Sequence, residues 1–183
     1  STPGRIFRRA TGMDARPLLE ITVLLYDTKA RRKVPFTVIR EPVSIYVCGI
    51  TPYDTTHVGH AFTYVFYDTL IRYLRFQGHQ TRYVQNVTDI DDDILRKAAE
   101  VGVDWRALVN RWTSHFIRDM QVLNVRPPDE YPRATDVIPD IVIAVRALIE
   151  RGLAYVSGGS VYYHVDAWPT FGRLSHLPRP EML

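Results

Sequence analysis

The stretch from Ser44 to Asp93 constrains the fold of this chain more than any other part of it. It opens with a short β-prone run, Ser44–Cys48, which Gly49 closes. A long helical pattern follows, and Gly78 ends it before a second β-prone run, His79–Val87. A strand–helix–strand succession in one sheet is almost always a right-handed crossover between parallel strands. The stretch therefore predicts an α/β fold whose ligands lie beyond the carboxyl ends of parallel strands.

The central helix of this stretch is predicted from apolar residues that recur at helical spacing. They are Val58, Ala61, Phe62, Val65, Phe66, Leu70 and Leu74. Asp68, Arg72 and Arg75 then mark the opposite face, which we expect to be solvated.

The start of that helix is suited to bind an anion. Free N–H groups and the positive end of the helix dipole suit a phosphate, and Gly59 lets a ligand approach the backbone closely. His57 and His60, three residues apart on one face, add donors for charge that develops on the phosphate. For these residues alone, a capping residue and a surface histidine are an equally good interpretation.

Two longer segments carry a resemblance to a known family. VCGITPYDTTHVGHAFTYV and the run Tyr83–Asp92, YVQNVTDIDD, resemble the cysteine-activating branch of class I aminoacyl-tRNA synthetases. That branch includes cysteinyl-tRNA synthetase and its paralogue, the cysteine ligase of mycothiol biosynthesis. The resemblance implies the first half of a Rossmann-like parallel sheet, the HIGH-type nucleotide-binding fold. It also implies that L-cysteine is activated with ATP and Mg²⁺ and passed to tRNA or to glucosaminyl-inositol.

The same resemblance assigns roles to the two strand ends and the helix start. It implies that His57 and His60 are catalytic and contact the ATP phosphates, while Gly59 makes room for the nucleotide. The residues it implies for the cysteinyl-adenylate pocket are Cys48, Gly49, Ile50, Thr51, Thr63, Asn86, Val87 and Thr88.

Cys48 is the one cysteine of the chain. Without the resemblance, a lone cysteine at a strand end is more often a small buried hydrophobe than a metal ligand. The resemblance implies instead that Cys48 binds Zn²⁺ together with a later Cys, His and Glu that this chain lacks. A soft thiolate bond to zinc would help to separate cysteine from serine. We expect the zinc site to be incomplete in this chain.

The acidic turn Asp89–Asp93 has two interpretations. Paired carboxylates can hold Mg²⁺ or serve in acid/base catalysis. Acidic residues also favour the first turn of a helix through capping and the dipole, here the helix Ile94–Val101. We favour the second interpretation.

The elements on either side are predicted from periodicity and turn residues. Ile21–Tyr26 and Val34–Ile39 indicate a hairpin with a basic, exposed connection. After the central stretch, Asp104 caps a helix whose broad apolar face we expect in the core. That face carries Trp105, Leu108, Val109, Trp112, Phe116, Met120 and Leu123.

A further helix and hairpin follow a Pro-Pro break. The helix spans Val137–Arg151, with Asp136 as N-cap. Its inward-facing residues are expected to be Ile138, Ile141, Val142, Val145, Leu148 and Ile149. Ala154–Val156 and Ser160–Val165, joined by two glycines, indicate a β-hairpin.

This organisation predicts a basic flexible arm over residues 1–20, the N-terminal half of a Rossmann-like catalytic domain over 21–125, and the start of a connecting insertion over 126–183. The resemblance implies that a complete enzyme continues beyond Leu183 with the rest of the sheet, a lysine-rich loop and an anticodon-binding domain. We therefore expect an N-terminal catalytic fragment that is inactive by itself.

Composition narrows the class of protein further. A net charge of +3 and a pI of about 9.1 give only a slight bias towards nucleic acid. The single cysteine excludes an internal disulfide, and no apolar run approaches the length of a membrane-spanning helix. We therefore expect a cytoplasmic protein without a membrane partner.

The sequence is compatible with four functions. A cysteine–tRNA ligase is favoured, because LIRYLRFQG, TDIDDDILRKA and PRAT resemble the tRNA enzyme. TPYDTTHVGHA instead favours the mycothiol-type ligase. A free-standing nucleotidyltransferase without a metal and a non-catalytic, truncated paralogue also stay open.

Overall fold

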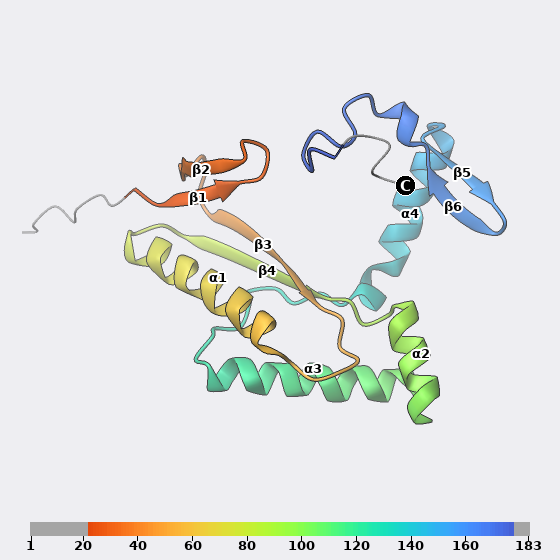
Figure 1. Cartoon of the computed structure of the whole chain (residues 1–183), viewed down its shortest axis with the longest axis horizontal. Helices are drawn as coiled ribbons and strands as arrows, with labels where there is room; N and C mark the ends of the chain where they lie inside the picture. The colour runs from red at the N-terminus through yellow and green to blue at the C-terminus, as the bar shows by residue number, and fades with distance from the viewer. Residues whose placement is uncertain (1–21, 178–183) are drawn as a thin grey trace, which may run out of the picture. The chain divides into compact units, whose positions relative to one another are not determined.

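The computed structural model describes residues 22–177, and its helices and strands are labelled in Figure 1. The chain divides into two compact units, Ser1–Thr37 and Val38–Leu183. The arm expected over residues 1–20 lies outside the described residues.

The first unit contains an antiparallel hairpin of β1 (Leu24–Asp27) and β2 (Arg32–Pro35). The hairpin was predicted, but β2 begins at Arg32 instead of Val34 and ends at Pro35 instead of Ile39. The Asp27 carboxylate accepts a hydrogen bond from the backbone N–H of Ala30, which closes a tight turn. Because this turn pairs Asp27 with Arg32, part of the basic run belongs to the strand.

The second unit is built on the predicted parallel pair. β3 (Val43–Ile50) and β4 (Thr81–Val87) lie side by side, and α1 (Val58–Phe76) connects them. The expected strand–helix–strand unit is therefore confirmed. Gly49 lies inside β3 and does not end it, and the pairing shifts register between Val47 and Ile50.

The face of α1 that packs inward differs from the prediction. Leu74 is buried as predicted, but Tyr64, Asp68 and Ile71 are buried as well, whereas Val58 is 84% and Phe62 74% exposed. α1 carries apolar residues around most of its circumference, so hydrophobicity alone did not select the inward face.

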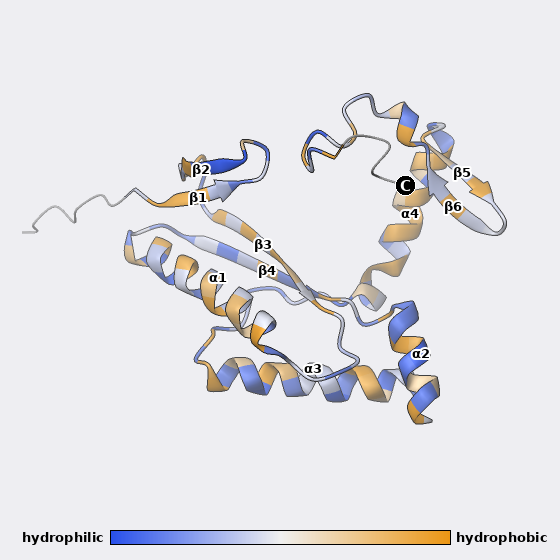
Figure 2. Ribbon diagram, in the orientation of Figure 1, coloured by the Kyte–Doolittle hydropathy of each residue, from blue (hydrophilic) through white to orange (hydrophobic). Residues whose placement is uncertain are grey.

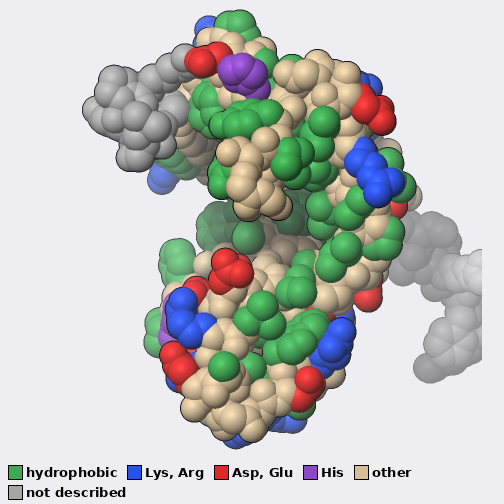
Figure 3. All heavy atoms as spheres, turned by 90° about the vertical axis from the view of Figure 1, so that its right-hand side faces the viewer, with side chains coloured by type: hydrophobic (Ala, Val, Ile, Leu, Met, Phe, Trp, Pro, Cys, Tyr) green, Lys and Arg blue, Asp and Glu red, His purple; other side chains and the backbone are tan. Residues whose placement is uncertain are grey.

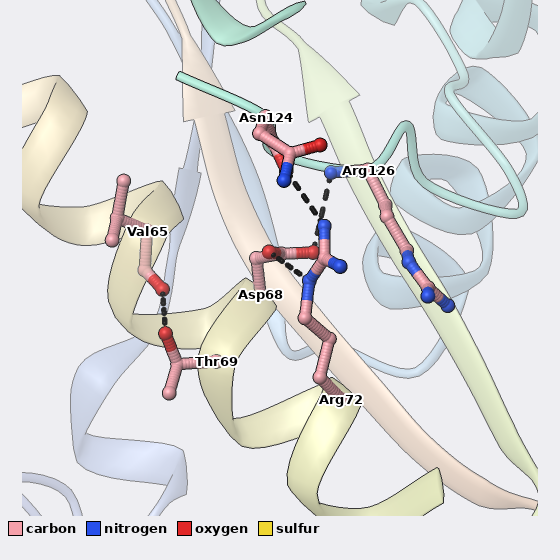
Figure 4. Close-up of polar contacts among 6 residues, drawn as sticks. All are labelled: Val65, Asp68, Thr69, Arg72, Asn124 and Arg126. Atoms are coloured by element: carbon pink, nitrogen blue, oxygen red, sulfur yellow. Dashed lines mark hydrogen bonds and ion pairs between the residues drawn. The ribbon is translucent and has the colours of Figure 1, made fainter.

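Asp68 is buried because it finds polar partners, although it was predicted to be solvated. Its carboxylate accepts from Arg72 Nε at 2.6 Å and from the backbone N–H of Arg126 at 3.2 Å. Arg72 also donates to the backbone carbonyl oxygen of Asn124 at 2.6 Å. Figure 4 shows this network, which joins α1 to the loop after α3.

Two capped helices follow β4, as predicted. α2 (Asp92–Val101) has Asp91 as N-cap, and α3 (Trp105–Val122) has Asp104 as N-cap. α2 begins at Asp92, slightly earlier than expected, because Asp92 and Asp93 form its first turn. The apolar face of α3 enters the core through Leu108, Val109, Phe116 and Met120, whereas Leu123 is 45% exposed. The core cluster joins Phe116 and Met120 to residues of β3, α1 and β4.

The chain after α3 runs beside β4 before it forms further elements. Gln85 donates its backbone N–H to Glu130 and Val87 donates to Pro132, at 3.1 and 2.9 Å. Then come η1 (Ala134–Val137), α4 (Ile138–Glu150), the hairpin of β5 (Ala154–Ser157) and β6 (Ser160–Tyr163), and η2 (Val165–Ala167).

Two predictions about α4 are wrong. Asp136 is not its N-cap, because Asp136 lies within η1 and Val137 at the cap makes no side-chain cap hydrogen bond. No residue of α4 is buried, and Ile141 is 48% exposed although it was expected to face inward. α4 contacts only the short elements η1 and β5 to an appreciable extent, and these cannot cover its apolar surface. Figure 2 shows the hydrophobic character of α4, and Figure 3 shows hydrophobic side chains gathered on this side of the molecule.

Candidate nucleotide-binding site

A cavity of about 510 Å³ lies where β3 ends and α1 begins. Its lining residues are Gly49, Ile50, Thr51, Tyr53, Asp54, Thr55, His57, His60, Asp91 and Asp93. The structure thus brings together five of the residues that the resemblance implied, Gly49, Ile50, Thr51, His57 and His60, and adds Asp91 and Asp93 of the acidic turn. Tyr53, Asp54 and Thr55 were missed, although they lie inside the family-like segment that contains the histidines.

His57 and His60 form a stacked pair at the start of α1. Their ring centroids are 3.9 Å apart, with an angle of 22° between the ring planes. His57 is the N-cap, and its Nδ1 accepts from the backbone N–H of Gly59 at 3.1 Å. Nδ1 of His60 accepts in turn from the backbone N–H of His57 at 3.4 Å. With both Nδ1 atoms acting as acceptors, the neutral rings carry their hydrogens on Nε2.

Burial, and next the neighbouring His57, lower the pKa of His60 below its ordinary value. His60 is therefore neutral at neutral pH, which agrees with its role as a hydrogen-bond acceptor at Nδ1. Such a pair presents donors at Nε2 without placing two full positive charges side by side.

Gly59 is required by the histidine pair itself. A Cβ atom at this position would lie 2.9 Å from Cε1 of His57 and 3.0 Å from its Nδ1. A side chain would push the His57 ring out of its capping position. The predicted reason for this glycine was room for a nucleotide, and the structure adds this second one.

Asn86 and Gly49 hold the ends of the two strands together. Oδ1 of Asn86 accepts from the backbone N–H of Gly49 and from the Tyr46 hydroxyl, each at 2.8 Å. A Cβ atom at Gly49 would lie 1.5 Å from the backbone oxygen of Asn86, so no side chain fits there. The backbone N–H of Thr88 donates to the carbonyl oxygen of Ile50 at 2.9 Å.

The other predicted pocket residues lie next to the cavity and hold its elements in place, but they do not line it. Val87 is completely buried, and Thr88 accepts from the Asn86 side chain at 3.2 Å. Thr63 donates to the backbone oxygen of Gly59 one turn earlier in α1, at 3.0 Å. None of Thr63, Asn86, Val87 and Thr88 is among the residues that line the cavity.

A family model described as "tRNA synthetases class I (C) catalytic domain" matches residues 35–182. The chain belongs to this family.

Curated relatives of this synthetase-family chain fall into two groups. The cysteine–tRNA ligase of Thermosynechococcus vestitus is 49% identical over 152 residues, which are 82% of this chain and 31% of the relative. The L-cysteine:1D-myo-inositol 2-amino-2-deoxy-alpha-D-glucopyranoside ligase of Catenulispora acidiphila is 48% identical over 163 residues, 88% of this chain and 38% of the relative. The chain thus spans about a third of the length of the curated relatives that it matches.

Solved structures with the same fold belong to other class I synthetases. The Mycobacterium tuberculosis methionyl-tRNA synthetase bound by methionyl-adenylate matches with a TM-score of 0.52 and 21% identity. The match covers 67% of this chain and 29% of that one. The LeuRS of Agrobacterium radiobacter K84 matches with a TM-score of 0.51 and 20% identity, over 64% of this chain and 16% of that one. The predicted class I synthetase fold is therefore confirmed.

Cys48 is exposed on β3, and its backbone oxygen accepts from the Tyr64 hydroxyl at 3.1 Å. Within residues 22–177, no group of three or more His, Cys, Asp and Glu side chains is arranged to hold a metal ion. Zinc requires at least three protein ligands, so the described part of this synthetase-family chain does not fit a zinc ion.

The acidic turn has the capping role that we favoured for it, and its Asp91 and Asp93 also line the cavity. Asp91 caps α2 by accepting from the backbone N–H of Asp93 at 2.9 Å. Asp89, 2% exposed, accepts from the backbone N–H and the hydroxyl of Thr135, at 2.9 and 2.6 Å. Asp89 thereby ties the end of β4 to η1.

In the part of the chain that the structure describes, no helix combines the length and the apolar character needed to cross a membrane.

Proposed function

We propose that the whole protein activates L-cysteine with ATP and transfers the cysteinyl group to tRNA. One observation carries this proposal: a chain of the class I (C) synthetase family has a cavity at the end of β3 and a capped pair of histidines at the helix start beside it.

In the first step, a carboxylate oxygen of cysteine attacks the α-phosphorus of ATP. The bond from this phosphorus to the bridging oxygen breaks, and pyrophosphate leaves with the electron pair. Negative charge grows on the phosphate oxygens during the displacement. The Nε2–H groups of His57 and His60, together with the N-terminal end of α1, would donate to these oxygens and lower the barrier.

Cysteinyl-adenylate would then lie between the strand ends that Gly49 and Asn86 hold together. A hydroxyl of the acceptor attacks its carbonyl carbon, and AMP leaves as the ester forms. ATP would enter with Mg²⁺, and zinc would contact the cysteine thiol through Cys48 and ligands outside the described residues. The described residues do not supply a complete zinc site, and we derive no step through either ion.

A second molecule is a candidate for the acceptor of the cysteinyl group, namely the inositol glycoside. The relative named for this glycoside is 48% identical to the chain, and the cysteine–tRNA ligase is 49% identical. We propose tRNA because segments in α1, α2 and η1 resemble the tRNA enzyme.

The two acceptors are separated by giving the whole protein cysteine, ATP and either tRNA or glucosaminyl-inositol. We expect an ester on tRNA that mild alkali hydrolyses, and no amide on the amino sugar. Formation of the amide alone would assign the second function.

A further inference from the structure

A second cavity, of about 350 Å³, adjoins the nucleotide cavity. It lies between the end of α2 and the first half of α3. Tyr53 and Asp54, in the loop between β3 and α1, line both cavities. The two cavities therefore meet at this loop.

The second cavity combines cations with aromatic rings. Lys97 comes from α2, and Arg111 and Trp112 come from α3. The Arg111 guanidinium lies 5.3 Å from the centre of the Trp112 ring. The Lys97 ammonium is 3.6 Å from a Glu100 carboxylate, in a pair that solvent reaches at both partners. Such exposed pairs are weak, so Lys97 can exchange this partner for another anion.

The remaining lining is apolar, and it has few opposing charges. Leu108, only 6% exposed, and Val101 contribute hydrocarbon surface. Asp54 is the one acidic residue among the lining side chains, against the two cations Lys97 and Arg111. The chemistry therefore suits a ligand with flat apolar rings and negative charge.

We propose that this cavity binds the single-stranded 3′ end of the acceptor tRNA. Lys97 and Arg111 contact backbone phosphates, and Tyr53 and Trp112 offer ring faces to the bases, as in other sites for single-stranded nucleic acid. The position agrees with the function proposed above, on which this inference rests, because the acceptor end must reach an adenylate in the adjoining cavity. The amino sugar of the alternative acceptor fits less well, since its ammonium group would face two cations.

The test is a Lys97→Gln, Arg111→Gln double variant of the whole protein. Binding of tRNA is measured by fluorescence anisotropy at several salt concentrations. Loss of two phosphate contacts should weaken binding by about 10-fold or more and lower the slope of log affinity against log salt by about 1.4. Arg118→Gln, compared with the single variant Arg111→Gln, is the matched control, because each removes one positive charge from α3 and Arg118 lies two turns further along, outside the lining of this cavity.

A second variant, Trp112→Leu, tests base stacking separately from charge. It should weaken tRNA binding by about fivefold or more with an unchanged salt slope. Circular dichroism checks the fold of this variant, since Trp112 is half-buried.

Cysteine-dependent pyrophosphate exchange, which needs no tRNA, is measured on the same proteins. In the double variant, we expect the fold-decrease in tRNA affinity to be about 10 times larger than any fold-decrease in the rate of pyrophosphate exchange. Wild-type affinity and salt slope in the double variant would overturn the inference while leaving cysteine activation intact. A higher KM for glucosaminyl-inositol in that variant, with unchanged tRNA binding, would overturn it as well. Absence of cysteine-dependent pyrophosphate exchange in the wild-type protein would instead contradict the proposed function itself.

Discussion

The rings of His57 and His60 stack 3.9 Å apart, and each ring accepts a backbone N–H through its Nδ1 atom. Helix capping and hydrogen-bond donation thus use opposite edges of the same two rings. The Nδ1 atoms stabilise the start of α1, and the Nε2–H groups stay available for an anion. Stability and activity at this corner can therefore be separated by experiment.

The first prediction concerns pH. Burial and the neighbouring His57 lower the pKa of His60, so the folded chain binds fewer protons at this residue than the unfolded chain does. The stability contributed by neutral His60 is complete above about pH 6.5 and is lost as the pH falls through the folded-state pKa. The free energy of unfolding should fall less steeply from about pH 7 to about pH 5 in His60→Gln than in wild type. Denaturant titrations across this range test it, and equal slopes would contradict it.

The second prediction concerns Gly59. In Gly59→Ala the new methyl group meets the His57 ring, whose flexible side chain can rotate away. The helix itself gains up to about 1 kcal/mol from the alanine. The gain from alanine and the loss of the His57 cap are of similar size, so we expect nearly unchanged thermal stability, together with a loss of about 10-fold or more in pyrophosphate exchange by the whole protein. Wild-type exchange in this variant would show that the position of the His57 ring does not matter.

The third prediction concerns Gly49. In Gly49→Ala the methyl group meets backbone that cannot move without separating β3 from β4. We expect a loss of about 3 kcal/mol or more in the free energy of unfolding. Ser44→Ala, at an exposed position of the same strand, is the control and should change stability by less than about 0.5 kcal/mol. Comparable chemical denaturation curves for the two variants would be evidence against the close approach of the strands.

The fourth prediction concerns metal. One thiolate cannot hold zinc alone, and the described residues supply no group of three ligands. The purified 183-residue chain should carry well under one zinc ion, whereas the whole protein should carry about one and lose it on Cys48→Ser. Elemental analysis by mass spectrometry decides this. Stoichiometric zinc in the 183-residue chain, or full retention after Cys48→Ser, would contradict the assignment of Cys48.

Local patterns predicted the histidine corner well. The β-prone run and the two histidines are close in sequence, so the strand and the helix start that follows it are predicted by short-range rules, although β3 continues beyond Cys48 to Ile50. The N-cap Asp104, and capping of the preceding helix by the acidic turn, were predicted for the same reason.

Features that depend on distant residues could not be predicted in this way. The Gly49–Asn86 contact joins two strands, and the register shift that permits it has no local signal. The inward face of α1 was misassigned because burial of Asp68 depends on Arg126, far along the chain. α4 was expected to be buried because its residues are apolar, but burial also requires a partner of sufficient area.

Pyrophosphate exchange in variants of the histidine pair shows whether these two rings act on ATP. His57→Asn retains a good N-cap, so the fold should keep its stability while the Nε2–H donor is lost. We predict cysteine-dependent exchange in the wild-type whole protein, and a loss of about 100-fold or more in His57→Asn and in His60→Ala. His115→Ala, at a partly exposed position of α3, should exchange at the wild-type rate. Near-normal exchange in both variants of the pair, or exchange that serine supports as well as cysteine, would contradict the account.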